Sequence, residues 1–468
     1  MSAPASTVPE LASASAGELA RRIAAKEVTS REVVEALLER IEAVNPDLRA
    51  IRVVLTDEAL AAADEADGAV AAGSELGSLH GVPFTVKENV DVAGTATTGG
   101  LSALLEAVAS RDAPSVAGLR AAGGIPIGRT NMAESGLRWH SYSDAGGHTV
   151  NPWDASRTPG GSSGGDAVAL ATGMTPLGIG NDLGGSLRVP PQFTGTVAIK
   201  PTFGRVGHAA TVPPLDGPMS IQVMAVNGPM ARTIADLRLV LGPISASDPR
   251  DPWQVPAPLE GPPAPRRAAV ALWDGVHPDV AAGVRRAAEA LSAAGWEVED
   301  GEPPRVDDAL TTWRDIVVSE VRGIWPQIEP VSSEDQKLFV SHIFEFVPAL
   351  DPMAHAMAYV ERQALGREWG EWLARTPLVL APTCAHPPFE VGFDVTGPEV
   401  VGELLEWMRM NVPVNLLGVP AVAVGAGLEN GLPQGVQVIG PRFREDLCLD
   451  AAQAIETALG TLTPIDPG

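Results

Sequence analysis

Two clusters of glycine and serine have the residue types needed for acyl transfer. The first is PGGSSGGDA, which contains Ser162 and Ser163, and the second is GNDLGGSLRVP, in which Ser186 follows two glycines. Residues 189–191 can begin a short helix, because proline is tolerated in a first turn. Backbone N–H groups would then converge near the Ser186 hydroxyl, and such groups stabilise a developing oxyanion. The second cluster therefore predicts a serine nucleophile beside an oxyanion hole.

Neighbouring residues weaken three alternative interpretations of the first cluster. A phosphate-binding loop needs a lysine directly after its last glycine, and none stands there. A flexible linker would not pass at once into DAVALATG, whose small residues favour a helix. The GxSxG elbow of α/β-hydrolases matches Gly161, Ser163 and Gly165, but it needs a preceding strand, and NPWDASRTP carries two prolines.

A nucleophilic serine also needs a base, and Lys87 is the candidate. The chain contains only four lysines, Lys26, Lys87, Lys200 and Lys337, and its other basic residues are arginines. The apolar stretch VPFTVKENV favours a buried Lys87, and burial lowers the pKa of a lysine towards neutrality. Arginine stays protonated and cannot replace it. A lysine whose ammonium group emerges at a strand edge is the alternative.

Three segments in order, VPFTVKENV, PGGSSGGDA and GNDLGGSLRVP, resemble the amidase signature family of serine hydrolases. The resemblance extends through GTVAIKPTFGRV to GLPQGVQVIGP and spans about residues 15–460. It implies an α/β fold with a large mixed, mostly parallel β-sheet covered by helices on both faces. It also implies a single domain over residues 1–468, with an N-terminal helical segment at about 10–70, a signature core at about 75–210 and a C-terminal part of the same sheet at about 265–460. No metal and no cofactor are expected.

The resemblance implies a Ser–cisSer–Lys triad. Ser186 is the implied nucleophile and neutral Lys87 the implied base. Ser162, which follows Gly161 through a cis peptide bond, is the implied relay between them. Ser186 attacks the carbonyl as its proton passes to Ser162 and on to Lys87, and water later releases the acid from the acyl-enzyme. The implied oxyanion hole consists of the backbone N–H groups of Leu183, Gly184, Gly185 and Ser186.

Further residues have expected supporting roles. Ser163 is expected to form hydrogen bonds within the site, and Asp182 with Arg188 to orient the nucleophile loop, a surface ion pair being the alternative. Met132 in TNMAESG is expected to contact the acyl group, with a core methionine as the alternative. The residues that line the substrate pocket are expected in the region from about 300 to 420. Several aromatic residues could form an apolar pocket or could equally be core residues: Trp139, His140, Trp313, Trp325, Phe344 and Phe346.

The sequence departs from common patterns of the family at three positions near the triad. Asp166 stands where serine or alanine is frequent, and Asn181 and Leu183 replace residues that are often Ser or Thr and Thr or Ile. None of the three removes a catalytic group. We therefore expect them to affect the choice of substrate and not the type of reaction.

Strand and helix patterns alternate along the chain, as in an α/β layered fold. A helix is predicted from a Thr29–Glu32 capping box to Asn45-Pro46, and strands are predicted from Gly81 and from Met174. Residues 266–300 predict a strand, a helix and a strand. Asn430-Gly431 between two apolar runs predicts a hairpin. The Pro-rich segment 245–267 predicts an extended surface connection.

The composition narrows the class of protein. The 468 residues carry a formal net charge of −25, which disfavours nucleic acid and anionic membrane surfaces as partners. Cys384 and Cys448 lie far apart without a CxxC pattern, so neither a disulfide framework nor a cysteine zinc site is expected. We see no signal peptide and no membrane span, and we expect a cytoplasmic monomer or homodimer.

The predicted function is hydrolysis of the C–N bond of an aryl or acyl amide through an acyl-enzyme on Ser186. A urethanase, carbamate or ester hydrolase using the same chemistry is the alternative. A second alternative is the glutaminase subunit of a tRNA-dependent amidotransferase, and a third is an inactive member of the family that only binds a ligand. The expected partner is a small amide or carbamate.

Overall fold

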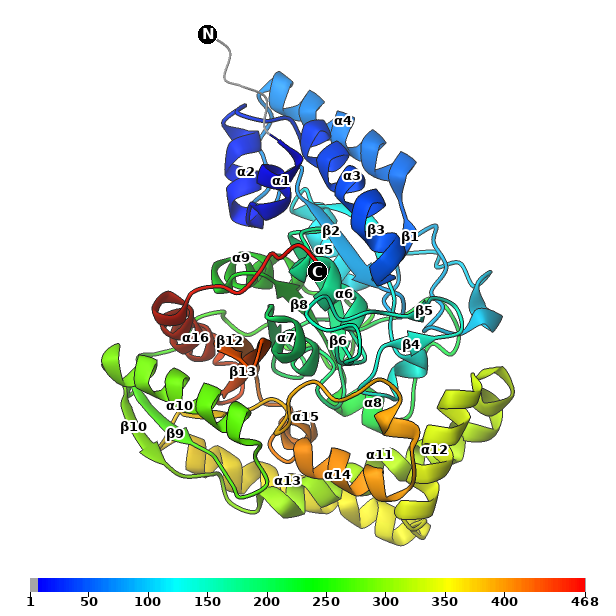
Figure 1. The fold of residues 1–468 in the computed structure, drawn as a ribbon, viewed down its shortest axis with the longest axis vertical. Helices are drawn as coiled ribbons and strands as arrows, with labels where there is room; N and C mark the ends of the chain where they lie inside the picture. Colours follow the sequence, from blue (N-terminus) through cyan, green and yellow to red (C-terminus); the bar gives the residue numbers. More distant parts are fainter. Residues whose placement is uncertain (1–6, 468) are drawn as a thin grey trace.

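A mixed β-sheet of eleven strands runs through the centre of the computed structural model, which describes residues 7–467 (Figure 1). The sheet begins at a strand near the N-terminus and ends at strands from the second half of the chain. In spatial order its strands are β1 (Ile51–Val54), β3 (Ile125–Thr130), β2 (Pro83–Lys87), β6 (Leu177–Asp182), β8 (Val226–Ala231), β7 (Val197–Lys200), β12 (Ala421–Glu429), β13 (Leu432–Ile439), β11 (Leu378–Pro382), β9 (Arg267–Val270) and β10 (Glu297–Asp300).

Both faces of the sheet are buried, because successive strand residues enter two different hydrophobic cores. In β11, Leu378 and Leu380 belong to the first core, whereas Val379 and Ala381 belong to the second. Side chains of a strand alternate between the two faces, so the two cores lie on opposite sides of the sheet. The expected covering of both faces by helices is confirmed.

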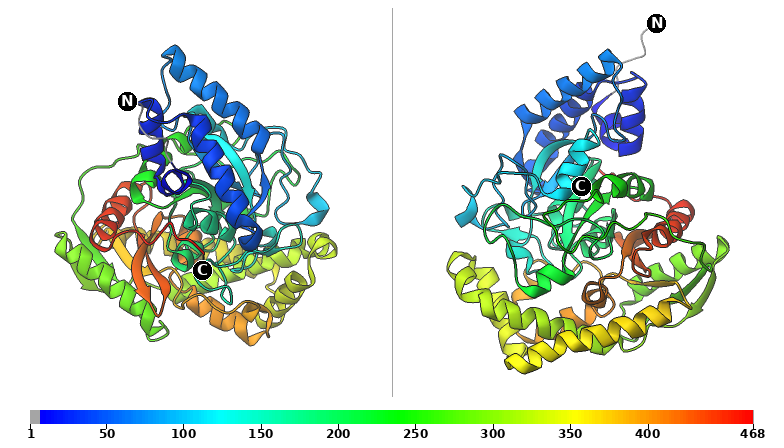
Figure 2. Two further views of the ribbon diagram at one scale, coloured as in Figure 1. Left: turned by 45° about the horizontal axis from the view of Figure 1, so that its top comes forward. Right: turned by 180° about the vertical axis from the view of Figure 1, so that it is seen from behind.

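Separate sets of helices contribute to the two cores, and they form separate layers in Figures 1 and 2. The helices in the first core are α1 (Val8–Ser13), α2 (Ala16–Ala24), α3 (Ser30–Leu48), α4 (Thr56–Ala72), α5 (Pro114–Ala121), α9 (Ile234–Ile244), α10 (Pro278–Ala293) and α16 (Glu445–Leu459), together with part of α6 (Gly164–Ala171). Those in the second core are α7 (Val189–Thr194), α8 (Met219–Met224), α11 (Val306–Ile328), α12 (Glu334–Phe346), α13 (Pro352–Leu373), α14 (Glu399–Trp407) and α15 (Val412–Leu417).

The strand directions correct the expectation of a mostly parallel sheet, because six of the ten strand pairings in this sheet are antiparallel. Parallel pairs among the described strands occur in β3–β2–β6, which lies next to the antiparallel edge pair β1–β3, and in β11–β9–β10 at the other edge. The antiparallel centre includes the predicted hairpin, in which Asn430 and Gly431 have φ angles of 50° and 79° and join β12 to β13. Buried apolar runs look alike in parallel and antiparallel strands, so the sequence does not reveal the directions of the others.

Most of the helices and strands predicted from local patterns are present, but one helix ends later than predicted. The Thr29–Glu32 capping box starts α3, but this helix continues through Pro46 to Leu48. A proline in the last turn removes a single backbone donor, and Asn45 stabilises the exit by accepting hydrogen bonds from the N–H groups of Ala50 and Ile51. Residues 245–266 contain no helix after α9 and no strand before β9, as predicted for the Pro-rich connection.

Two expectations from composition can be compared with the described residues. Cys384 and Cys448 are buried free cysteines. No helix between residues 7 and 467 is both long enough and apolar enough to cross a membrane.

Candidate active site

Lys87 is the last residue of β2 and is completely buried. Its Nζ donates three hydrogen bonds, to Ser162 Oγ at 2.7 Å, to Ser163 Oγ at 2.9 Å and to Asn181 Oδ1 at 2.7 Å. The structure therefore brings together the lysine and both serines of the first cluster. Asn181 completes the set of acceptors. From the sequence, Asn181 is noticeable only as a departure from the common pattern of the family. Its position in the strand that leads to Ser186 was the one feature that could have indicated a contact with Lys87.

The surroundings of Lys87 favour its neutral form. Burial lowers the pKa of the amine to about 7, and the negative charges of Asp166 and Asp182 oppose that shift. A neutral amine keeps two donors and gains one lone pair, so one of the three contacts must then reverse. The Asn181 amide oxygen cannot donate, whereas a serine hydroxyl can. Neutral Lys87 is thus arranged to accept a proton from a serine.

The loop that carries Ser162 is held closely against residues 138–141. The Gly161–Ser162 peptide bond is cis, as the resemblance implies. A Cβ atom on Gly161 would lie 2.6 Å from the Arg138 carbonyl oxygen, so only glycine fits there. The Ser141 hydroxyl donates to the Gly160 carbonyl at 2.8 Å and accepts from the Gly164 N–H at 3.0 Å, and so fixes the two ends of the loop.

Asp166 lies in the first turn of α6, close to the buried lysine, and is itself fully buried. Thr85, two residues before Lys87 in β2, donates to its Oδ1 at 3.4 Å. Burial raises the pKa of the Asp166 carboxyl, and the charge of Lys87 opposes the shift. The departure from the family at this position therefore adds a second titratable group to the site.

Asp182 and Arg188 form a buried ion pair with Nε to Oδ2 at 3.0 Å, which rules out the surface ion pair. Burial alone would raise the pKa of Asp182, but the Arg188 guanidinium outweighs it and lowers this pKa to about 2. The carboxylate accepts from the N–H groups of Gly185 at 2.7 Å and of Leu187 at 3.1 Å. These bonds fix the backbone on both sides of Ser186.

Two tryptophans hold the other side of the loop formed by residues 183–186, called here the oxyanion loop. Trp313 Nε1 donates to the Leu183 carbonyl at 3.0 Å, and Trp139 Nε1 donates to the Gly184 carbonyl at 2.8 Å. The Gly185 N–H, one of the donors implied by the resemblance, is occupied by Asp182. The carbonyls on one side and this N–H on the other therefore have fixed partners.

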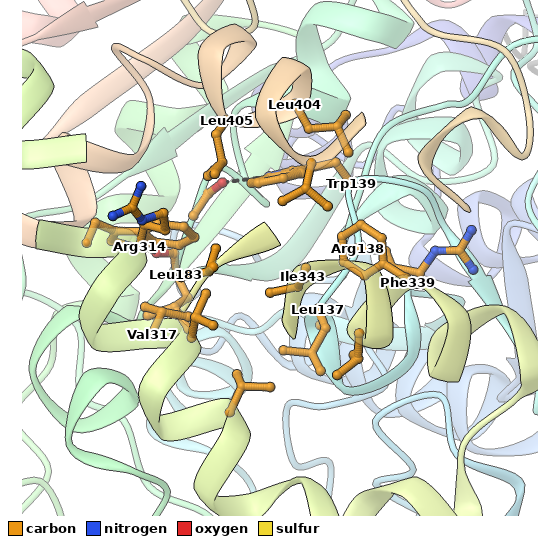
Figure 3. A pocket seen from close by; sticks show the side chains of 18 of the residues that line it. Leu137, Arg138, Trp139, Leu183, Arg314, Val317, Phe339, Ile343, Leu404 and Leu405 are labelled. Atoms are coloured by element: carbon orange, nitrogen blue, oxygen red, sulfur yellow. Dashed lines mark hydrogen bonds between the residues drawn. The ribbon is translucent and has the colours of Figure 1, made fainter. Parts of the chain in front are cut away.

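An apolar cavity opens beside the oxyanion loop (Figure 3), with an empty volume of about 790 Å³ that is partly open to solvent. Ser186 lies in its wall and is 6% exposed. Three helices, α11, α12 and α14, supply most of the lining. Its side chains include Leu137, Trp139, Leu183, Trp313, Val317, Phe339, Val340, Ile343, Leu404 and Leu405.

The cavity also lies next to Ser162. Gly136 lines it together with Ser186, and a Cβ atom on Gly136 would be 3.5 Å from Ser162 Oγ. Ser162 therefore lies directly behind a residue of the cavity wall, whereas Ser186 is itself part of that wall.

Two of the residues expected in the pocket line the cavity, and the others do not. Trp139 and Trp313 line the cavity. Met132 is not part of the lining: it is fully buried, as in the alternative of a core methionine, and its methyl lies beneath Gly136. The lining of the cavity likewise does not include His140, Trp325, Phe344 or Phe346.

Comparison with known proteins agrees with this geometry. The sequence pattern of the family described as Amidase matches residues 32–449. The chain belongs to the amidase family. This amidase is 41% identical over 456 residues to an indoleacetamide hydrolase of Bradyrhizobium diazoefficiens, covering 96% of the chain and 87% of that protein.

Two further relatives show the breadth of the similarity. This amidase is 34% identical to one subunit of the glutamyl-tRNA(Gln) amidotransferase of Salinispora arenicola, over 97% of the chain and 99% of that protein. The crystal structure of a bacterial aryl acylamidase of the amidase signature family superposes with a TM-score of 0.81 at 26% identity, over 95% of this chain and 96% of the other. The amidase signature fold and amide hydrolysis are therefore assigned.

Proposed function

We propose that this amidase hydrolyses amides whose acyl group is apolar and carries an aromatic ring, through an acyl-enzyme on Ser186. The observation that carries the proposal is the apolar cavity beside Ser186 and the oxyanion loop. One relative supports this class of substrate, since it is named for indoleacetamide, whose acyl group carries an indole ring.

The proposed reaction begins with neutral Lys87. It accepts the Ser162 proton over their 2.7 Å contact as Ser162 takes the proton of Ser186. The Ser186 oxygen attacks the amide carbonyl, the C–N bond breaks, and Ser162 returns a proton to the leaving nitrogen. Water then attacks the ester on Ser186 and gives its proton to the same relay, which returns a proton to the Ser186 oxygen as its bond to the acyl group breaks and the acid leaves.

The tetrahedral intermediate needs donors for its oxyanion. We assign this role to the backbone N–H groups of Leu183, Gly184 and Ser186. The fourth implied donor, Gly185, has a different role in this proposal, because its N–H already donates to Asp182 at 2.7 Å. It fixes the loop in the conformation that presents its neighbours.

The lining of the cavity favours an apolar acyl group over the side chain of glutamine. The two arginines of the lining are already paired, Arg138 with Asp394 at 2.8 Å and Arg314 with Asp315 at 2.6 Å. They are therefore poorly placed to bind the carboxylate of an amino acid. Carbamates and esters with an aromatic group use the same acyl transfer and are the second class to test.

The first experiment compares wild type and Ser186→Ala on a panel of amides. The panel contains indole-3-acetamide, phenylacetamide, acetamide, glutamine, an aryl p-nitroanilide and an aryl carbamate. We expect the aryl amides to be preferred and Ser186→Ala to lose about a thousandfold or more in kcat. Ser74→Ala, at an exposed position, is the matched control. Preference for acetamide or glutamine would refute the substrate class, and activity retained in Ser186→Ala would refute the nucleophile.

A further inference from the structure

The oxyanion loop receives two hydrogen bonds from side chains that lie far away in sequence. Trp313, on α11, donates to the carbonyl of Leu183, and Trp139, in the segment before β4 (Tyr142–Ser143), donates to the carbonyl of Gly184. The donors are 130 and 45 residues from their acceptors. Figure 3 shows the bond of Trp139 at the edge of the cavity.

These bonds determine where the N–H groups of Gly184 and Gly185 point. In a trans peptide the carbonyl and the N–H point in opposite directions. The Leu183 carbonyl shares its peptide with the Gly184 N–H, so the bond from Trp313 turns this N–H away from the indole. The Gly184 carbonyl shares its peptide with the Gly185 N–H, and that peptide is held at both ends, by Trp139 and by Asp182.

Packing reinforces the hydrogen bond of Trp313. A Cβ atom on Gly184 would lie 2.6 Å from Cζ2 of the indole, so the ring lies directly on the loop backbone. Trp313 is 7% exposed and belongs to the second hydrophobic core, so its ring has little freedom to move. The ring and the loop therefore occupy a fixed relative position before a substrate binds.

We propose that Trp139 and Trp313 are positioning residues that preorganise the oxyanion hole through their indole N–H groups. This inference rests on the proposed function, because it concerns the oxyanion formed at Ser186. Donors that are already aimed at the developing charge need no reorganisation during the reaction, and the gain appears in the transition state. Loss of either N–H should therefore lower kcat more than it raises KM.

The test replaces each tryptophan by phenylalanine, which keeps an aromatic ring and removes the N–H. Trp369→Phe is the matched control, since Trp369 is buried and its Nε1 donates to the Pro304 carbonyl at 2.8 Å, away from the cavity. A second variant places the isosteric 3-benzothienylalanine at position 139 or 313, which keeps the ring size and excludes cavity formation or poor folding as the cause of a loss.

Two readouts are measured, steady-state hydrolysis of the best aryl amide and the rate at which a small alkyl fluorophosphonate labels Ser186. We expect Trp139→Phe and Trp313→Phe each to lose about tenfold in kcat and in labelling rate, with KM within about twofold of wild type. The benzothienyl variants should show the same loss and Trp369→Phe no loss. Unchanged kcat, a loss confined to KM, or full rates in the benzothienyl variants would overturn the inference.

The labelling arm separates this inference from the proposed function. A wild type that is labelled but hydrolyses no aryl amide would refute the proposed substrate, while the labelling rates of the variants would still decide the role of the two indoles. A wild type that is inert to both the amides and the fluorophosphonate would refute both proposals.

Discussion

At the scale of single residues, the oxygen atoms around the buried lysine govern its protonation. Nζ of Lys87 contacts two hydroxyls and one amide oxygen, and none of these acceptors carries a charge. The nearby carboxylates act on the lysine through space, because neither Asp166 nor Asp182 accepts one of these three bonds. The protonation of Lys87 is therefore open to tuning by single substitutions that leave the serines in place.

The first prediction concerns pH. The proposed base must be neutral, and burial lowers the pKa of Lys87 to about 7. We expect kcat/KM to rise with pH through an inflection near that value and to fall as the amine becomes protonated below it. A profile measured from pH 5 to 9 on the best amide checks this. A profile that rises only above pH 9 would indicate a lysine with an ordinary pKa.

The second prediction uses two substitutions that should shift the pKa of Lys87 in opposite directions. Asp166→Asn removes a negative charge that raises the pKa of Lys87, so the acid limb should move to lower pH. Asn181→Asp adds such a charge beside Nζ, so the limb should move to higher pH, in each case by about one unit. Asn181→Ala, which removes an acceptor without adding charge, is the control. If the acid limb moved in the same direction in Asp166→Asn and Asn181→Asp, the nearby charges would not control the pKa of Lys87.

The sequence identified Lys87, Ser162, Ser163 and Ser186 because these residues stand in compact motifs. It did not identify Asn181 as a hydrogen-bond acceptor of the lysine, nor the two tryptophans that donate to the oxyanion loop. Trp313 lies 130 residues from the carbonyl that it contacts. A contact between distant segments has no local pattern, and aromatic residues in apolar stretches look the same in a core and in a cavity wall.

At the scale of elements, helix α12 forms one wall of the cavity and is fixed at its start. Glu134 accepts from the Ser333 N–H at 3.0 Å and from the Ser333 hydroxyl at 2.9 Å, while its other oxygen accepts from the Asp144 N–H at 2.6 Å. Burial raises the pKa of Glu134, and these hydrogen bonds oppose the shift. The helix that lines the pocket is thus tied to the segment that lies beside Ser162.

The third prediction tests the cavity as the site of the acyl group. Val317 on α11 lines the cavity, and Val317→Trp should fill it. We expect kcat/KM for indole-3-acetamide to fall about tenfold or more, while that for acetamide stays within about twofold. Thr311→Trp, at an exposed position of the same helix, is the control. Equal losses for both amides would contradict this placement of the acyl group.

At the scale of the whole molecule, the C-terminal segment is joined both to the middle of the chain and to an N-terminal helix. The Ile465 N–H donates to the Ala171 carbonyl at the end of α6 at 2.8 Å, and Arg40 of α3 forms an ion pair with Asp466 at 2.7 Å. The C-terminus accordingly lies beside α6 in Figure 1. One sheet connects strands from both halves of the chain. The sequence predicted the layers of this fold but not the antiparallel centre, because strand direction depends on connections that apolar patterning does not encode.

The fourth prediction is that residues 1–468 unfold as one domain. One shared sheet and the contacts of the C-terminal segment favour a single cooperative transition. Calorimetry should give one endotherm that coincides with the loss of helical circular dichroism and of tryptophan fluorescence. Two separated endotherms would contradict the single domain.

The complete burial of Lys87 has a practical consequence for protein chemistry. Lys200 is buried as well, so of the four lysines only Lys26 and Lys337 reach solvent. Reagents that acylate or methylate amines should therefore modify these two side chains and leave the amine of Lys87 free. Attachment through Lys26 and Lys337 to an amine-reactive support would hold the enzyme in a few defined orientations while Lys87 remains unmodified.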